Sequence, residues 1–465
     1  MSRFRARRWS RGFHLSDALF GTDTDAVATE SGRLFRPRHN RRSMDDGSSV
    51  DYGERAQAVL GFSRWWQVAA AAGMMAAVSP YQYVWSSIAP PLSKSLDIAP
   101  AALGAVFSFY VVFQSLSQFP AGWWRDRRGP RALIALAALL AGGGYVGLAY
   151  ATTVPQLYVL YSLGAVGVGI VYTVAVNTAV KWFPDRTGLT TGLGTMAFAA
   201  GSALAVPYVR ANATVGGYPA VLRNVGLVIL AVLLVGSLLL KDPPEEWLGL
   251  SDDDTGVAAS LRGTAYTTRE MVGTWQFWLL YAMFVATAGA DLVVIANVVT
   301  FADELGFTDL IATVAATLLP LAAGGSRLLL GEVTDRFGRK PVMVASFLLA
   351  GLFRFGLVTA GRAGRPVAFV ALVLLAMFFS SPLYVYFPAL LSDYYGSEFS
   401  SGNYAVLYTA KVGGGVIAGT VAGYLAAAVG WGPTFALGGA LAAGAGLAAL
   451  ALRPPEGSGL AAAAD

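Results

Sequence analysis

The sequence predicts an all-α membrane protein with twelve transmembrane helices in two six-helix pseudo-repeats. Composition is the first indication, because 55% of the 465 residues are hydrophobic and only 13% are charged, against about 25% charged in soluble proteins. The mean hydropathy is +0.55. The apolar residues also occur in blocks long enough for a membrane helix, which needs about 20 of them, and one loop motif occurs twice. A soluble monomer and a mainly disordered chain are both excluded.

Twelve apolar segments follow one another from residue 65 onward. The first six are 65–88, 103–123, 132–150, 157–180, 189–209 and 221–240. The second six are 275–301, 310–333, 341–358, 366–391, 404–425 and 435–452. The two sets have nearly equal lengths, 176 and 178 residues, as expected for a duplicated transporter whose substrate site lies between its repeats.

Polar stretches give the remaining organisation of the chain. Residues 1–64 are predicted to be a basic cytoplasmic tail, mostly disordered and without the apolar core of a signal peptide. The two bundles, 65–240 and 275–452, are separated by a long polar cytoplasmic loop, 241–274. A short tail, 453–465, follows the second bundle.

Basic residues predict the orientation. With the N-terminus inside, 25 of the 33 Lys and Arg fall on the inner side and five on outer loops, which by the positive-inside rule places both termini in the cytoplasm. This asymmetry also explains the net charge of +5. We therefore expect a multi-pass protein of the plasma membrane that contacts the lipid bilayer and binds no nucleic acid.

Several kinds of chemistry are excluded by composition. The chain has no cysteine, and its two histidines, His14 and His39, lie in the N-terminal tail, so the apolar body has neither the thiolate nor the imidazole ligands of common metal sites. No phosphate-binding GxxxxGK[ST] loop is present. We expect no enzyme activity, no cofactor, no metal and no use of ATP.

The repeated motif lies in two matched inner loops, Gly122–Arg131 and Gly331–Lys340, at a constant offset of 209 residues. Its aspartates are suited to cap a helix or pair with a basic group, and its glycines to let helices approach closely. These loops resemble the signature loop of the major facilitator superfamily, and the pattern of six plus six helices resembles that superfamily over residues 65–452. The candidate conformational residues are Asp126, Arg127, Gly129, Asp335, Arg336 and Gly338.

Several runs in both halves have a distinctive order and spacing: 161–172, Asn177-Thr178, 182–186 with Gly188 and Gly192, 276–278, 325–327, Tyr384 with Phe387-Pro388, and Asn403-Tyr404 with Lys411. Together these runs resemble the oxalate:formate antiporter family, relatives of the monocarboxylate porters.

Four ionisable side chains fall well inside apolar segments: Asp291, Arg327, Arg354 and Lys411. Charges at this depth are costly and indicate function. From the rise of 1.5 Å per residue, Arg327 lies roughly 12 Å and Lys411 roughly 13.5 Å from the inner side, level with Tyr172 and Tyr384. Two cations and two phenols at one depth predict an anion site.

The family resemblance gives these residues finer roles. It implies that Arg327 and Lys411 bind the two ends of a dicarboxylate, with Tyr83, Tyr172 and Tyr384 in the lining and Gln114 joining from the second helix. Tyr408 and Ser380 stand where the family's oxalate carriers have bulky tryptophans. A looser pocket is expected, which favours a small carboxylate without specifying oxalate.

Asp291 departs from the family pattern, and three roles are open to it: carrying a proton, pairing with Arg354 or Arg327, or capping a helix break near Gly289. Arg354 lies roughly 21 Å from the inner end of its helix. We expect it to snorkel to the outer headgroups.

Glycines recur in two of the predicted helices, as Gly415, Gly419 and Gly423 and as Gly164, Gly167 and Gly169. Such spacing lets helices pack backbone to backbone and slide. The other interpretation is a general richness in glycine and alanine, since the chain has 54 glycines.

The function expected from these features is secondary transport of small organic anions by alternating access, as an exchange against a counter-anion. A proton-coupled monocarboxylate symporter is the alternative. A metabolite sensor that signals through the N-terminal tail is an alternative of another class, and a membrane enzyme is the weakest because no catalytic cluster is visible.

Overall fold

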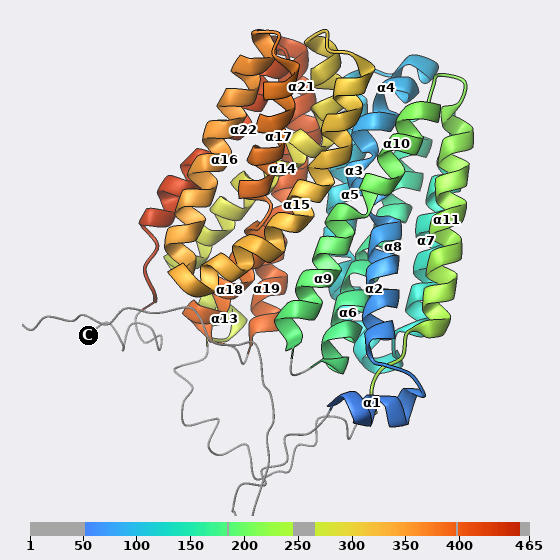
Figure 1. Cartoon of the computed structure of the whole chain (residues 1–465), viewed down its shortest axis with the longest axis vertical. Coiled ribbons are helices and arrows are strands. Elements are labelled where there is room, and N and C mark those ends of the chain that lie inside the picture. The colour runs from blue at the N-terminus through green and yellow to red at the C-terminus, as the bar shows by residue number, and fades with distance from the viewer. Residues whose placement is uncertain (1–51, 184–185, 245–265, 397–398, 456–465) are drawn as a thin grey trace, which may run out of the picture. The chain divides into compact units, whose positions relative to one another are not determined.

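The computed structural model describes residues 52–183, 186–244, 266–396 and 399–455 (Figure 1). Within these ranges the regular structure is entirely helical. Most of the predicted N-terminal tail, the end of the C-terminal tail, and residues 245–265 of the central loop lie outside them. The domain boundaries assigned from the sequence therefore stay predictions.

The first half of the chain forms the helices on the right of Figure 1. They are α2 (Trp65–Val78), α3 (Pro80–Tyr83), α4 (Trp85–Leu96), α5 (Pro100–Leu116), α6 (Gln118–Arg128), α7 (Arg131–Leu148), α8 (Val154–Trp182), α9 (Thr187–Ala200), α10 (Ser202–Asn212) and α11 (Tyr218–Leu239).

The second half forms the helices on the left. They are α14 (Trp275–Glu304), α15 (Asp309–Phe337), α16 (Arg339–Arg362), α17 (Pro366–Ser380), α18 (Leu383–Tyr395), α19 (Ser400–Tyr408), α20 (Ala410–Val416), the π-helical turn η4 (Ile417–Val421), α21 (Ala422–Val429) and α22 (Trp431–Leu450).

These helices confirm the predicted all-α membrane fold. Eleven helices among the described residues are long and apolar enough to cross a membrane. The twelfth predicted segment, the first in the chain, is divided into α2, α3 and α4, and α4 contains Pro90 and Pro91. Proline removes a backbone donor and interrupts a helix. This segment ends at Leu96, eight residues later than predicted.

Two short helices lie outside the membrane segments. The end of the N-terminal tail, expected to be mostly disordered, forms α1 (Tyr52–Leu60). The central loop ends in α13 (Thr268–Val272), whose capping box pairs Thr267 with Glu270. A capping box satisfies backbone donors at a helix start, so both polar segments contain local order that hydropathy alone does not predict.

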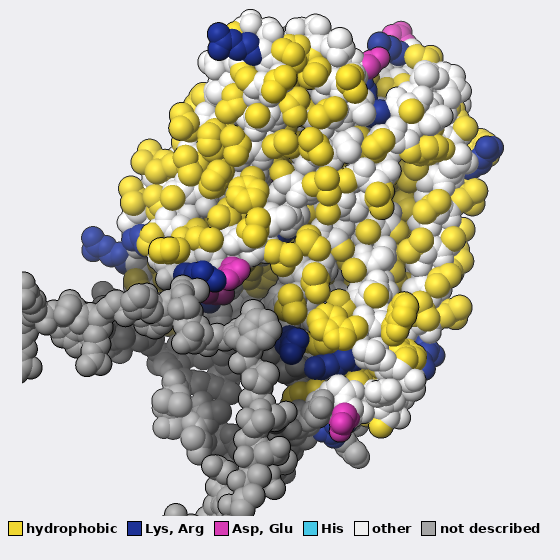
Figure 2. Space-filling model, in the orientation of Figure 1, with side chains coloured by type: hydrophobic (Ala, Val, Ile, Leu, Met, Phe, Trp, Pro, Cys, Tyr) yellow, Lys and Arg dark blue, Asp and Glu magenta, His cyan; other side chains and the backbone are white. Residues whose placement is uncertain are grey.

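The sides of the helices carry apolar side chains, and the visible charges gather toward the two ends (Figure 2). The exposed residues of the described helices include large hydrophobic ones, such as Leu204, Leu238 and Val367. A monomeric protein with such an apolar surface would be unstable in water. It is the surface that a bilayer requires. The two ends are named here by their loops: the basic end carries Gly129 and Gly338, and the far end carries Asn212 and Arg362. Which side of the membrane each end faces stays a prediction.

The two halves are in contact near the far end, where α5 crosses η4. A Cβ placed on Gly419 would lie 2.1 Å from the carbonyl oxygen of Gly104, and one on Gly415 would lie 2.4 Å from Cβ of Val111. Within the first half, a Cβ on Gly167 would lie 2.7 Å from the backbone nitrogen of Ala141. These contacts favour the interpretation of the helix glycines as close-approach positions.

Ser108 of α5 strengthens the same crossing. Its hydroxyl donates to the carbonyl of Gly415 at 3.0 Å and accepts from the backbone N–H of Thr420 at 2.9 Å. These two backbone groups lie five residues apart, which is the spacing of a hydrogen bond in a π turn. Arg210 also joins the halves, through an ion pair with Asp309 at 3.1 Å. The halves are therefore linked at the far end by specific polar contacts.

Candidate functional site

Lys411 lies on α20 and is almost completely buried. Its ammonium donates to Oε1 of Gln114 at 2.8 Å and to Oε1 of Gln82 at 3.3 Å, and both glutamines belong to the first half. The hydroxyl of Tyr408, one turn earlier in the second half, accepts at 3.4 Å. A cation of the second half is thus held by neutral oxygens from both halves.

Arg327 lies on α15 and is also buried. Its Nη1 donates to the carbonyl of Thr195 in α9 at 2.8 Å, and its Nε donates to the hydroxyl of Ser381 at 3.3 Å. The centroid of the Tyr384 ring lies 4.8 Å from the guanidinium carbon and 5.7 Å from the ammonium of Lys411. Both cations therefore contact the same aromatic ring.

Aromatic residues connect the other predicted positions to this pair. The ring of Tyr408 lies 6.3 Å from that of Tyr384 and 6.4 Å from that of Tyr172. Phe198 then joins Tyr172, at 5.3 Å, to Tyr83, at 6.2 Å. The structure thus brings the seven predicted binding residues into one region between the halves.

Two features distinguish this region from an ordinary packed core. Among the described residues, neither Arg327 nor Lys411 forms an ion pair, although both are buried. The amide nitrogen of Gln114 is also buried, and no described atom accepts a hydrogen bond from it. Burying two cations without an acidic partner, and an amide N–H without an acceptor, is energetically unfavourable. An anion bound beside them would balance the charge and accept the hydrogen bond.

Arg354 corrects one prediction. It does not reach the headgroups, because its side chain is 0% exposed and its Nη2 pairs with Oδ1 of Asp291 at 2.6 Å. Ser380 lies between them, accepting from Arg354 at 2.9 Å and donating to Asp291. Of the three roles open to Asp291, the structure shows pairing with Arg354. Ser380 forms hydrogen bonds with both members of the pair. The depth of Arg354 along its helix did not reveal that it faces the interior.

The predicted conformational loops show glycine conformations that were not foreseen. Gly129 and Gly338 have φ angles of 74° and 85°, and no neighbouring helix would contact a Cβ on Gly129. Their structural requirement is a positive φ where α6 and α15 end, rather than close helix packing.

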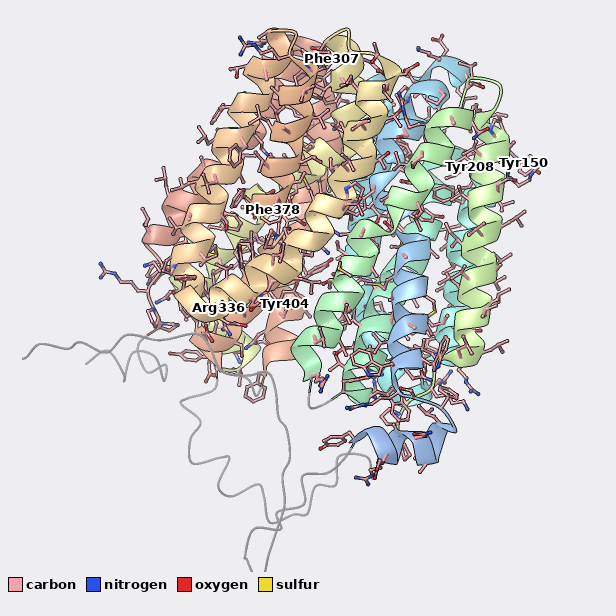
Figure 3. The ribbon with its side chains drawn as sticks, in the orientation of Figure 1. Tyr150, Tyr208, Phe307, Arg336, Phe378 and Tyr404 are labelled. Carbon is pink, nitrogen blue, oxygen red and sulfur yellow. The ribbon has the colours of Figure 1, made fainter. Side chains whose placement is uncertain are left out.

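The charged residues of these loops are placed differently in the two repeats. Arg127 lies over the ring of Trp123 at 4.0 Å, and Arg336 pairs with Glu332 within its own helix. Asp335 is exposed and makes no ion pair or hydrogen bond with a described residue, whereas the side chain of Asp126 lies outside the described residues. Figure 3 shows Arg336 at the basic end and Phe307 at the far end.

Neighbouring residues, which the sequence analysis did not single out, form two further ion pairs at the basic end. Arg125 is buried and bonds Asp242 at 2.8 Å and Thr178 at 3.2 Å. Arg339 pairs with Asp393 in the second half. The aspartates concerned lie on distant segments, so the repeat motif alone contained no signal for these pairs.

Comparison with protein families decides the identity of the fold. The family model described as the Major Facilitator Superfamily matches residues 68–297 and 279–465. The chain belongs to the Major Facilitator Superfamily. It is accordingly a transporter rather than an enzyme, and a multi-pass integral protein of the cell membrane.

Similar proteins and solved structures agree with this assignment. The oxalate:formate antiporter of Oxalobacter formigenes is 29% identical over 377 residues, covering 80% of this chain and 87% of that protein. An uncharacterised 38 kDa protein of Thermoproteus tenax is 32% identical over 403 residues, covering 84% and 95%. The crystal structure of a D-xylose-proton symporter has a TM-score of 0.68 at 17% identity, covering 85% and 100%, which supports the fold.

Three site residues of this superfamily member were missed from the sequence: Gln82, Phe198 and Ser381. Gln82 carried a signal, because it is a polar side chain beside Tyr83 inside an apolar segment. Phe198 and Ser381 carried none, since phenylalanine and serine are common in membrane helices. Tyr404 also extends the aromatic region, 5.7 Å from Tyr408 and toward the basic end (Figure 3).

Proposed function

We propose that this transporter is a secondary carrier that exchanges small carboxylate anions of the oxalate and formate kind. The observation that carries the proposal is the pair of buried cations, Arg327 and Lys411, which contact one tyrosine ring and have no acidic partner among the described residues. Similarity to a protein named oxalate:formate antiporter supports the same substrate class.

The chemistry of the two cations suits a carboxylate. A guanidinium offers a planar fork of donors that matches a carboxylate, and an ammonium offers a compact charge. In this structure they bond only neutral oxygens, so an anion would provide stronger, charge-assisted hydrogen bonds. The unpartnered amide nitrogen of Gln114 adds a further donor beside Lys411.

The site draws on both halves, as alternating access requires. Arg327 and Lys411 belong to the second half, and their partners Thr195, Gln82 and Gln114 belong to the first. Polar contacts of Ser108 and Arg210 join the halves at the far end. We infer that these contacts close the far end in this arrangement, and that breaking them gives the anion access to that side.

Exchange is favoured over proton symport by the state of Asp291. It is the acid nearest the middle of the described membrane segments, and its carboxylate is bonded to Arg354 and Ser380. A symporter needs an acid that releases and takes up protons during the cycle. Without one, the empty carrier would have to reorient with two uncompensated buried charges, which is costly. A counter-anion removes that cost.

Reconstituted liposomes test the proposal. The purified protein is offered labelled oxalate, formate and acetate outside, with vesicles preloaded with unlabelled anion or left empty of it. We expect rapid uptake only into preloaded vesicles. Uptake into unloaded vesicles driven by a pH gradient would overturn exchange in favour of symport. Saturable binding without any flux would favour a sensor, and neither binding nor flux of any carboxylate would overturn the substrate class.

A further inference from the structure

A buried ion pair lies beside the candidate site without being part of it. Asp291 of α14 and Arg354 of α16 have side chains 3% and 0% exposed, and their charged atoms are 2.6 Å apart. Ser380, the last residue of α17, bonds both of them. Neither member of the pair bonds the aromatic residues or cations of the site.

The residue after Ser380 connects this pair to the site. Ser381 is buried, and its hydroxyl accepts the hydrogen bond from Nε of Arg327. Pro382 follows and α18 begins at Leu383, so Ser380 ends one helix and Ser381 lies in the short break before the next. One hydroxyl therefore faces α14 and α16, and the next faces α15.

We propose that Asp291, Arg354 and Ser380 form a positioning unit that fixes Ser381 and, through it, the guanidinium of Arg327. A helix break has fewer backbone hydrogen bonds to hold it than a helix interior, so side chains must define its geometry. A buried ion pair adds little stability over an apolar replacement. Its contribution here is the defined position of three helices, α14, α16 and α17, beside Arg327.

The positioning unit thereby affects which carboxylate the transporter prefers. This step rests on the proposed function, in which Arg327 binds one carboxylate and Lys411 the other. A dicarboxylate needs both cations at a fixed separation, whereas formate has a single carboxylate that Lys411 binds alone. Loosening Arg327 therefore weakens oxalate more than formate.

Conservative serine variants provide the test. Ser380→Ala and Ser381→Ala are compared with Ser346→Ala, a matched control that removes a buried hydroxyl bonded to Tyr386 in the same half. Losing one hydrogen bond should raise KM for oxalate about fivefold. In Ser380→Ala, KM for formate and kcat for both anions should change less than about twofold, and Ser346→Ala should leave the ratio of the two KM values unchanged.

A second variant removes both charges of the ion pair, so the net charge of the protein is unchanged. The double replacement Asp291→Asn with Arg354→Gln replaces both charged groups by neutral polar amides, and it should raise KM for oxalate as Ser380→Ala does. Adding Ser381→Ala to it should cause little further change, because residues acting through one contact are non-additive. Equal rises for oxalate and formate, or full additivity, would overturn the positioning unit.

Failure of the proposed function is distinguishable from failure of this inference. If the wild-type protein transports neither anion, carboxylate exchange fails. The positioning unit is then judged from thermal unfolding of the same variants in detergent. A smaller shift from Ser381→Ala in the double variant than in the wild type supports the coupling, and equal shifts overturn it.

Discussion

Lys411 and Gln114 link the two halves of the transporter in the middle of the candidate site, through a hydrogen bond of 2.8 Å from the ammonium to the amide oxygen. Both side chains are buried. The amide nitrogen of the same glutamine stays without a described acceptor. One neutral side chain thus holds a buried cation and still presents a donor to a ligand.

Replacing Gln114 by glutamate is expected to abolish anion transport. The new carboxylate has nearly the same shape, and from the position of the amide oxygen it would pair with Lys411 and occupy the charge that the substrate needs. Initial uptake of labelled oxalate into preloaded liposomes measures the effect. Gln156→Glu is the control, since Gln156 caps α8 at the far end and glutamate serves equally in a capping box. Unchanged uptake by Gln114→Glu would contradict the proposed site.

Removal of either cation should also weaken the binding and transport of oxalate. Lys411→Ala and Arg327→Ala each delete one charge-assisted contact, which is worth about 1.5–3 kcal/mol, and binding should weaken about 10- to 100-fold. Isothermal titration with oxalate in detergent measures affinity separately from flux. Lys94→Ala, which removes an exposed lysine near the far end, should bind oxalate normally. Wild-type affinity in both site variants would disprove the anion site.

Ser108→Ala should favour opening of the far end. The change deletes the hydrogen bonds to Gly415 and Thr420, each worth about 1 kcal/mol. Because the chain has no cysteine, a single Ala296→Cys can report access from the far side. Ala296 belongs to α14 and is buried, at the wall of a cavity of about 360 Å³ that α4 and α5 also line. A membrane-impermeant maleimide should label it at least about fivefold faster in the Ser108→Ala background.

The control for that measurement is Ser237→Ala, whose hydroxyl bonds only within its own helix, to Leu234. Its labelling rate should equal that of the parent. Equal rates for Ser108→Ala and the parent would show that the serine does not hold the far end closed.

Gly419→Ala should prevent the arrangement seen here. The added Cβ would lie 2.1 Å from the carbonyl of Gly104, a distance that requires the two helices to move apart. We expect rapid maleimide labelling at Ala296→Cys together with loss of exchange, because the far end no longer closes. Gly444→Ala, which meets no neighbouring atom within 4 Å, should behave as the parent. Normal exchange by Gly419→Ala would refute the role of this crossing.

The capping box of α13 predicts a pH dependence. Hydrogen bonds from the backbone and hydroxyl of Thr267 hold the pKa of Glu270 below its ordinary value. A lowered folded-state pKa stabilises the helix above the ordinary value of about 4.3, and this stabilisation is lost as pH falls through the folded-state pKa. Hydrogen exchange of residues 268–272 should be faster in Glu270→Ala at about pH 7, with the difference shrinking at acid pH. A difference that stays constant with pH would contradict the prediction.

The sequence was sufficient to predict the fold and the central cations. Helical rise converts sequence distance into depth, and the sequence distances alone placed Arg327, Lys411 and Tyr172 at one level. Depth carries no information about direction around the helix. For that reason Arg354 was expected at the headgroups, whereas packing turns it toward Asp291.

The uncharged groups that contact Arg327 and the helix glycines could not be predicted from the sequence. The carbonyl of Thr195 and the hydroxyl of Ser381 bond Arg327, but neither group differs in sequence from many others in membrane helices. Likewise, the spacing of Gly415 and Gly419 indicated a close crossing without indicating that Gly104 lies opposite. Such pairings depend on how the two halves meet, which local sequence does not encode.

The hydroxyl of Ser108 has a consequence for the opening of the far end. It bonds a carbonyl and an N–H that are natural partners of each other in a π turn. When α5 withdraws, the carbonyl of Gly415 in α20 and the N–H of Thr420 in η4 can bond one another. The backbone at this crossing can therefore stay hydrogen-bonded in both arrangements, while the hydroxyl of Ser108 adds its two bonds only in the closed one.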